Sequence, residues 1–376
     1  MTKARQLADL GNAYDDGALS NRNLIINGAM QVAQRGTSQT NVSTFGVKTV
    51  DRWKSGPNSF GIYTNTQDTN APAGFGYSSK WLCTTADTSP ASTDYMRIDY
   101  GIEAQDLQHL NYGTSDAKDL TLSFWVKSNV AETYVVWFYK SDGTARHIAF
   151  TYVIDAINTW EYKTITIPSD SNALGVINND NGEGLLMCFC LSTSTANSSG
   201  TLPSAWENYV AVNRFAGQTA NVGGAVNNYW QITGVQLEVG DTATPFEHRS
   251  YGEELARCQR YFWAQVPKGE ANGAGGNAGQ YIIGDGGFLG TGQVECHVQY
   301  PVQMRASPTL QPSSGTNHFL LEASSGIDYF SNLVAFAQKK QSSLLYNSGA
   351  TSGTAGEYTR VAASSVNSYV YWDAEL

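Results

Sequence analysis

The chain has 376 residues, of which only 15% are charged, and a formal net charge of −10. This length exceeds one average domain, so we expect two folded domains. A typical soluble protein carries about 25% charged residues; here Asn, Ser, Thr and 37 glycines take their place. That mixture favours short strands and tight turns over the helices of many cytosolic enzymes. The acidic charge argues against non-specific binding to nucleic acid or anionic membranes.

The first residues and the cysteines indicate the cellular compartment in which the protein is made. Residues 1–17 lack the apolar core of a signal peptide, and no run of 18 apolar residues is present. We therefore expect a protein that is made in a cytoplasm, either stays there or leaves it by a route other than secretion, and does not insert into a membrane. The cysteines are odd in number and scattered, which predicts reduced, buried side chains rather than a disulfide framework or a zinc site. They are Cys83, Cys188, Cys190, Cys258 and Cys296, and a strand would point Cys188 and Cys190 to one face.

The first predicted element in chain order is a short helix. Its pattern covers residues 4–10 and ends at Gly11. Alone it is too short to be stable in water, so it must dock on this protein or on a neighbour. We interpret residues 1–22 as an anchoring segment, with Arg5, Leu7 and Leu10 as its contact residues.

Strand patterns begin at residue 23. The clearest alternation covers residues 120–127, where one face consists of Leu120, Leu122, Phe124 and Val126. Asp142-Gly143 between strand-forming residues is a strong hairpin signal. Further strands are predicted at residues 133–140, 147–154, 162–167, 185–191 and 229–239. Strands at this spacing predict an antiparallel sandwich or jelly roll over residues 23–250.

The period of the pattern changes at Ser250. Ser250 and Glu253 form a capping box, and apolar residues follow at helical spacing, which predicts one helix over residues 251–262. This connecting segment, residues 251–263, leads to a smaller second β-sandwich over residues 264–376. Residues 267–279 are rich in Gly and Ala and are expected to form a linker or loop. The strands of the second domain are predicted at residues 293–299, 318–321, 333–338 and 369–372. The predicted fold class is all-β.

An ordered set of segments resembles a known family. The segments are residues 23–38 (NLIINGAMQVAQRGTS), 51–53 (DRW), 234–240 (GVQLEVG), 244–247 (TPFE), 258–262 (CQRYF) and 300–309 (YPVQMRASPT). In this order they resemble phage tail-fibre and virion proteins common in short-tailed and marine phages, and residues 3–9 resemble leaders of the same group. The resemblance implies a location in the virion tail, other virion proteins as partners and frequent homotrimers. It also implies a jelly roll like that of carbohydrate-binding modules, and no shared catalytic residues.

Acidic residues near turns raise the question of calcium. Residues 178–184 (NNDNGEG) place Asp180 and Glu183 around a tight glycine turn, and such oxygen ligands suit calcium. An ordinary Asn/Asp/Gly surface turn explains the same pattern. The resemblance adds Glu238, because strand-end carboxylates hold calcium in jelly-roll carbohydrate modules. We expect no cofactor, with a structural calcium ion at these residues as the alternative.

Aromatic residues make up 12% of the chain. Tyr and Trp rings on exposed strand faces or loops offer a stacking surface to sugars. Near the distal turns, our candidate glycan contacts are Tyr329, Phe330 and Tyr346. Three tryptophans in the middle of strands are instead expected in the sandwich interior: Trp125, Trp137 and Trp230.

The sequence contains no motif that indicates an enzyme. No Walker loop, zinc-protease motif or nucleophile elbow is present, and the five histidines are dispersed. We therefore expect a virion tail fibre or receptor-binding protein that is anchored by its N-terminus and contacts host surface polysaccharide. Two alternatives stay open. One is a purely structural adaptor or capsid decoration protein. The other is a polysaccharide depolymerase, which needs only two carboxylates brought together by folding.

Overall fold

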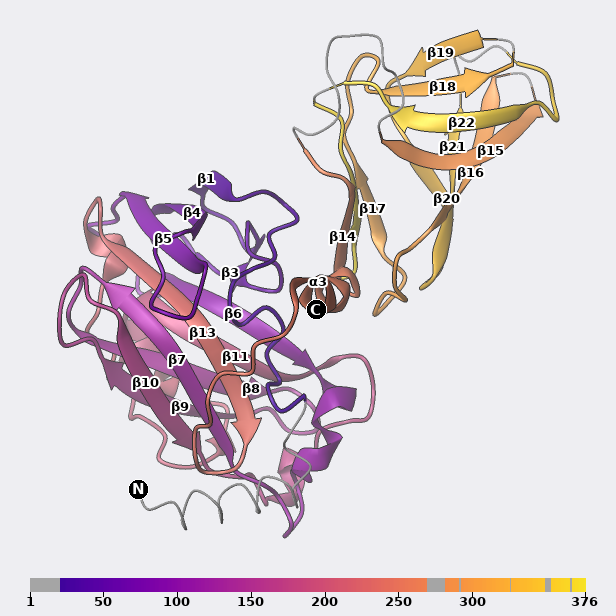
Figure 1. Ribbon diagram of the computed structural model, residues 1–376. Helices are drawn as coiled ribbons and strands as arrows, with labels where there is room; N and C mark the ends of the chain where they lie inside the picture. Colours follow the sequence, from indigo (N-terminus) through magenta and orange to yellow (C-terminus); the bar gives the residue numbers. More distant parts are fainter. Residues whose placement is uncertain (1–20, 269–280, 291, 325, 349–352, 366) are drawn as a thin grey trace. The chain divides into compact units, whose positions relative to one another are not determined.

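The computed structural model describes residues 21–268, 281–290, 292–324, 326–348, 353–365 and 367–376. Its contacts divide the chain into two units (Figure 1). The first contains Thr37–Ser250 with the segment that ends at Gln31, and the second contains Tyr251–Glu375 with Val32–Gly36. The place of Val32–Gly36 in the second unit was not expected from the sequence. Among the described residues, no helix has the length and apolar character needed to span a membrane.

The first unit is a sandwich of two antiparallel sheets, which confirms the all-β prediction. Sheet A has the order β1 (Ser38–Val42), β4 (Ile62–Asp68), β5 (Ser78–Thr85), β13 (Tyr229–Val239), β7 (Leu120–Ser128), β10 (Glu161–Ile167). Sheet B has the order β12 (Glu207–Asn208), β9 (Arg146–Val153), β8 (Thr133–Lys140), β11 (Glu183–Thr193), β6 (Tyr95–Glu103), β3 (Lys54–Ser55), β2 (Gly46–Val47).

The sandwich core follows from alternation along the strands. On β7 the predicted apolar face is fully buried: Leu120, Leu122, Phe124 and Val126 are 0% exposed. The predicted hairpin is also confirmed, because β8 and β9 pair across the Asp142-Gly143 turn with Lys140 opposite Arg146. Burial of this apolar surface is the main force that holds the two sheets together.

Short helical turns connect the strands: η1 (Ala104–Leu110), η2 (Ala173–Gly175), α2 (Thr195–Ser198), η3 (Ala211–Asn213) and η4 (Val222–Gly224). Residues 194–220, which we call the covering segment, pack on the outer face of sheet B. Phe215 of this segment joins a second apolar cluster with Val135, Trp137, Ala149, Cys188 and Cys190. Sheet B is therefore apolar on both faces over part of its area.

The second unit begins with α3 (Tyr251–Gln259), which is shorter than the predicted helix. The chain enters β14 (Phe262–Val266) because Phe262 pairs with Asp373 and is fully buried. Arg35 from the Val32–Gly36 segment stacks on the Phe262 ring, 3.3 Å from its centre, and pairs with Asp373 and Glu375. Burial in a sheet thus overrides the local helical pattern at residues 260–262.

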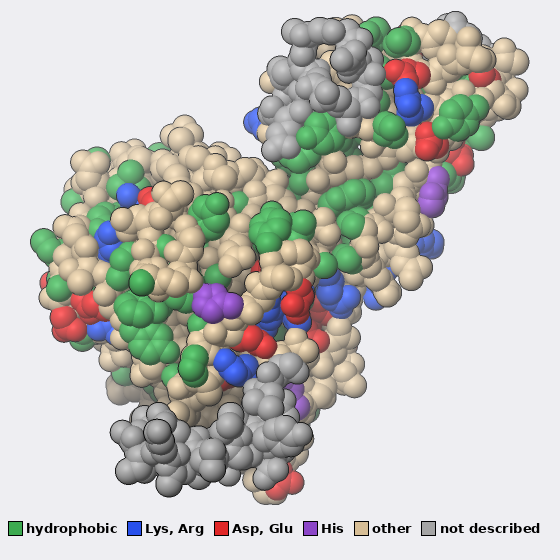
Figure 2. Space-filling view, viewed as in Figure 1, with side chains coloured by type: hydrophobic (Ala, Val, Ile, Leu, Met, Phe, Trp, Pro, Cys, Tyr) green, Lys and Arg blue, Asp and Glu red, His purple; other side chains and the backbone are tan. Residues whose placement is uncertain are grey.

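Two antiparallel sheets form the rest of the second unit. One has the order β14, β23 (Val370–Asp373), β17 (Thr309–Pro312). The other has the order β19 (Gly326–Phe330), β18 (Phe319–Ala323), β22 (Tyr358–Ala363), β15 (Ile282–Gly290), β16 (Gln293–Gln299), β21 (Ser342–Ser348), β20 (Val334–Gln338). A separate core includes Met304, Phe319 and Trp372, all of them 0% exposed. The face shown in Figure 2 is dominated by uncharged side chains and backbone, in keeping with the low charge content.

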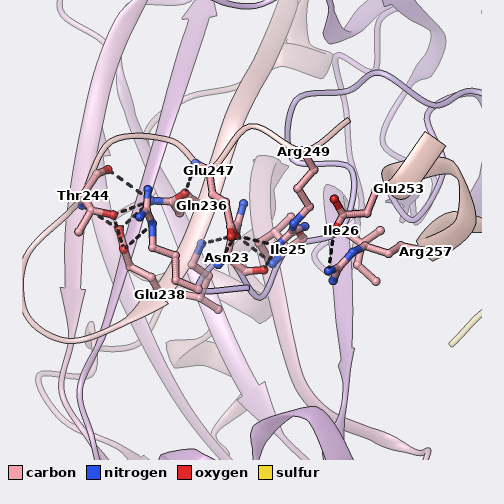
Figure 3. Close-up of polar contacts among 12 residues, drawn as sticks. Asn23, Ile25, Ile26, Gln236, Glu238, Thr244, Glu247, Arg249, Glu253 and Arg257 are labelled. Carbon is pink, nitrogen blue, oxygen red and sulfur yellow. Dashed lines mark hydrogen bonds and ion pairs between the residues drawn. The ribbon is translucent and has the colours of Figure 1, made fainter. Parts of the chain in front are cut away.

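A network of polar contacts closes the first unit; we call it the clasp (Figure 3). Its members are Asn23, Gln236, Glu238, Thr244, Glu247 and Arg249. The Asn23 side chain accepts hydrogen bonds from the backbone N–H of Ile25 (2.9 Å) and Leu237 (3.1 Å), and it donates to the carbonyl of Val235 (3.1 Å). These contacts fix the segment at residues 23–25 along β13.

The rest of the clasp fastens residues 244–249 to the same strand. Glu238 accepts hydrogen bonds from the Thr244 N–H (2.9 Å) and hydroxyl (2.6 Å), and from the side chain of Gln236 (2.8 Å). The side chain of Gln236 in turn accepts the backbone N–H of Glu247 at 2.8 Å. Buried polar groups that satisfy one another in this way specify one arrangement of the chain.

Replacing Asn23 by Ala is expected to lower the free energy of unfolding by about 2 to 4 kcal/mol, because it leaves buried backbone groups without partners. Urea denaturation followed by Trp fluorescence measures the change. Gln39→Ala, at an exposed position of β1, is the control and should shift stability by less than about 0.5 kcal/mol. Equal effects of the two substitutions would contradict the structural role of the clasp.

Candidate functional site

The outer face of sheet B carries a group of aromatic and charged side chains that are partly open to solvent. We call it the sheet B cluster. It consists of Tyr95, Arg97 and Asp99 from β6, Tyr139 from β8, and Tyr209 and Arg214 from the covering segment. Asp99 is buried and the other five are half-buried.

The register of sheet B explains why these side chains gather. On β6, Met96, Ile98 and Tyr100 point into the sandwich core, so Tyr95, Arg97 and Asp99 point outward. The outward residues of the neighbouring strand β11 are Cys188 and Cys190, and Cys188 stands between Asp99 and Trp137. These small side chains leave room above them for larger rings and for Arg214.

The cysteine pattern agrees with the sequence prediction. All five cysteines are buried, and Cys188 and Cys190 lie on one face of β11 in the second apolar cluster. Burial raises the pKa of both thiols well above the usual range. These two cysteines therefore form the floor of the cluster as small apolar side chains.

The rings of the cluster contact one another in series. Trp137 is 2% exposed and stacks on Tyr139, with ring centres 5.1 Å apart and planes 28° apart. Tyr139 meets Tyr209 edge to face at 5.5 Å. Trp137 thus supports two tyrosines whose rings remain half-exposed, and such packed rings hold their orientation without a ligand.

Charged groups lie beside these rings. Arg97 pairs with Asp99 at 3.1 Å, and its guanidinium also lies 5.2 Å from the centre of the Tyr95 ring. Burial raises the pKa of Asp99, and Arg97 and the thiol of Cys188 offset this effect only in part. The Oδ1 atom of Asp99 is buried and has no hydrogen-bond partner among the described residues. It is a hydrogen-bond acceptor without a donor inside the cluster.

His147 lies under the edge of the cluster and is fully buried. Its Nδ1 accepts the indole N–H of Trp137 at 2.9 Å, and its Nε2 lies 3.1 Å from Glu207. Nδ1 is therefore an acceptor, which requires a neutral ring with the proton on Nε2. Burial lowers the pKa of His147, although the hydrogen bond to Glu207 favours the charged form.

The candidate glycan contacts of the second unit do not come together. Tyr329 is exposed on β19 and Tyr346 is half-exposed on β21, with β18, β22, β15 and β16 between these two strands. Phe330 is a correction: it is 4% exposed and stacks on Phe319 in the core, with ring centres 5.6 Å apart. Alternation on β19 sends Tyr329 outward and Phe330 inward, and the short pattern in the sequence does not say which residue faces the core.

The three calcium candidates are not brought together, because Glu238 is on sheet A whereas Asp180 lies just before β11 and Glu183 at its start, in sheet B. Asp180 accepts the N–H of Gly182 at 2.8 Å within its own turn, and Glu183 lies on β11 of sheet B. Glu238 is on β13 of sheet A, where its carboxylate is engaged in the clasp. Across the described part of the chain, no group of three or more His, Cys, Asp or Glu side chains is arranged to hold a metal ion.

The remaining sequence predictions have mixed outcomes. The anchoring residues Arg5, Leu7 and Leu10 lie outside the described residues. Trp230 is buried in the sandwich core as expected, and Trp137 is buried on the opposite face of sheet B. Trp125 is a correction, because it is half-exposed on the outer face of sheet A beside Tyr162.

Sequence reasoning missed the sheet B cluster. The relevant signal in the sequence was alternation along two strands. It places residues 95, 97 and 99 on one face of the first strand, and residues 137 and 139 on one face of the second. Tyr209 and Arg214 come from an irregular segment without a strand pattern, so only the fold brings them beside β6 and β8.

Stability is expected to fall as the pH is lowered through about 6.5, the usual pKa of histidine. Because the folded pKa of His147 is lowered, the unfolded chain binds the proton first, and acidification favours unfolding. Thermal melting between about pH 8 and about pH 5 measures the slope. His147→Gln cannot titrate and should flatten part of that slope, whereas an unchanged slope would show that His147 is not responsible.

No family model and no curated protein matches the chain. Among solved structures, it is similar to the enzymatically active domain of a bacteriophage CBA120 tailspike protein, at 11% identity and TM-score 0.30; the match covers 58% of this chain and only 22% of that one. A family 61 carbohydrate-binding module in complex with β-1,4-galactotriose matches at 7% identity and TM-score 0.29, over 58% of this chain and 100% of the module. A family 11 carbohydrate-binding module of a Clostridium thermocellum cellulase matches at 13% identity and TM-score 0.27, over 57% and 98%. Identities this low transfer no residue roles.

Proposed function

We propose that the protein is a non-catalytic component of a bacteriophage virion, of the tail-fibre kind, and that its sheet B cluster contacts host surface glycan. The observation that carries the glycan part is the cluster itself. Three half-exposed tyrosine rings surround an ion pair and a guanidinium group on one sheet face.

The chemistry of the cluster suits a sugar. A pyranose ring has apolar C–H faces and a rim of hydroxyl groups. Tyrosine rings stack on the faces, and the half-buried guanidinium groups of Arg97 and Arg214 supply donors for the rim. Because Trp137 and the strands fix these side chains in advance, little conformational entropy is lost on binding.

The virion part of the proposal is supported by the sequence resemblance. Three of the segments that resemble tail-fibre proteins supply the members of the clasp from Asn23 to Glu247: residues 23–38, 234–240 and 244–247. The resemblance therefore falls on residues that hold the fold together. Residues of the sheet B cluster lie between these segments, where a virion protein is free to adapt to its host.

Tyr139→Ala is expected to weaken binding to purified host surface polysaccharide roughly five- to tenfold, because it removes a stacking ring worth about 1 kcal/mol. Affinity electrophoresis measures the change. Tyr162→Ala is the matched control, since Tyr162 is 45% exposed on the outer face of sheet A. In the same mixtures, no new reducing ends should appear.

Tyr329→Ala tests the alternative surface on the second unit. If Tyr329→Ala weakens polysaccharide binding roughly five- to tenfold and Tyr139→Ala leaves it unchanged, the contact surface is on the second unit. Release of reducing ends by the wild-type protein would replace the non-catalytic proposal with a depolymerase.

Antibody-labelled electron microscopy of phage particles is expected to place the protein at the tail. Deletion of residues 1–22 should remove it from particles while the isolated protein still binds polysaccharide. Labelling on the capsid shell would contradict the tail-fibre assignment and favour a decoration protein. The Tyr139→Ala protein is the internal control. It should still be incorporated into particles, because this substitution leaves residues 1–22 unchanged.

A further inference from the structure

Arg214 is a cation held among aromatic rings. Its guanidinium carbon lies 5.0 Å from the centre of the Trp137 indole and 5.4 Å from the centre of the Tyr209 ring. One Nη donates to the hydroxyl of Tyr209, and the buried Nε donates to no described residue. The carboxylates of the cluster region are paired elsewhere: Asp99 with Arg97 and Glu207 with His147. Aromatic rings lower the cost of burying a cation, but they do not neutralise it.

The ionisable groups around the cluster leave an excess of positive charge. Arg97, Arg214 and Lys54 act on the carboxyl of Asp99, and Lys54 and Arg97 also act on Glu183. Arg52 also acts on Glu183, and Glu207 is a third carboxyl group of the region, so four cations lie near three carboxyl groups. Burial raises the pKa of Asp99 and Glu183, which further favours their neutral forms. This local excess occurs on a chain whose net charge is −10, so the cluster attracts anions that the rest of the surface repels.

We propose that the ligand of the sheet B cluster is an acidic glycan, with Arg214 binding the carboxylate of a uronic-acid-type sugar. This inference rests on the proposed function. A guanidinium fork matches the two oxygens of a carboxylate, and the tyrosine rings stack on the sugar that carries it. The carboxylate supplies a counter-charge to Arg214, for which no ion pair with a described carboxylate is found and whose side-chain acceptor is the neutral Tyr209 hydroxyl, whereas a neutral sugar supplies only weaker hydroxyl acceptors.

The test compares acidic polymers with their esters. The probes are polygalacturonate, hyaluronate and oligosialic acid, each beside its methyl-esterified form, which keeps the sugar rings and removes the charge. The wild-type full-length protein should bind at least one acid form roughly tenfold or more tightly than its ester. Arg214→Gln should remove that preference, because it weakens binding of the acid form far more than binding of the ester. Lys163→Gln, which removes one positive charge from β10 of sheet A, should change neither affinity.

A second variant separates recognition from folding. Arg214→Lys keeps the charge but loses the fork, and it should retain part of the preference. Both Arg214 variants are checked by thermal melting, and if Arg214→Gln does not fold, Arg214→Lys and the salt dependence decide. Binding of the acid form should weaken when NaCl is raised from about 0.05 M to about 0.5 M.

The possible failures are distinguishable. Equal affinity for acid and ester forms overturns the acidic-glycan inference and leaves glycan binding by the cluster in place. An acid preference that survives Arg214→Gln also overturns it. Failure to bind any of the polymers and the host polysaccharide overturns the inference together with the proposed function.

Discussion

The two sheets of the first unit are held together by ring packing in their shared core, in which Phe189 has a connecting position. Its ring lies 5.1 Å from Phe124 on β7 and 5.6 Å from Trp230 on β13, measured between ring centres, so a single residue of sheet B joins two strands of sheet A. Because Phe189 points inward, its neighbours Cys188 and Cys190 point outward. Burial of the inward-facing residues of β11 thus determines which of its residues face outward, toward the sheet B cluster. A slip of one residue on β11 would exchange the two faces and remove the core and the sheet B cluster together.

Most of the first sandwich can be predicted from the sequence, because local patterns decide it. Alternation on residues 120–127 and the Asp142-Gly143 turn are short-range signals, and the strands and the hairpin form where these signals lie. Prediction fails where distant contacts compete with local preference. The helical pattern to Phe262 gives way to a strand that β23 completes, and Phe330 is buried by Phe319, from a neighbouring strand. The sheet B cluster is the clearest case, since its members lie between residues 95 and 214 and no motif connects them.

The clasp and the sheet B cluster are built from different kinds of residue. In the clasp, Glu238 accepts hydrogen bonds from Thr244 and Gln236, which leave its carboxylate little capacity for a ligand. The cluster instead places half-buried tyrosine rings and guanidinium groups on the outer face of sheet B. The segments that resemble tail-fibre proteins contain members of the clasp and none of the residues of the sheet B cluster.

The buried cysteines have a consequence for how the folded protein responds to oxidants. Burial raises the pKa of the thiols of Cys83, Cys188, Cys190 and Cys296, to about 12 for Cys296. The reactive thiolate is then scarce at neutral pH, and oxidants in the medium have poor access to these sulfur atoms. These four side chains are therefore expected to keep their chemical form as long as the protein stays folded, in oxidising as in reducing surroundings.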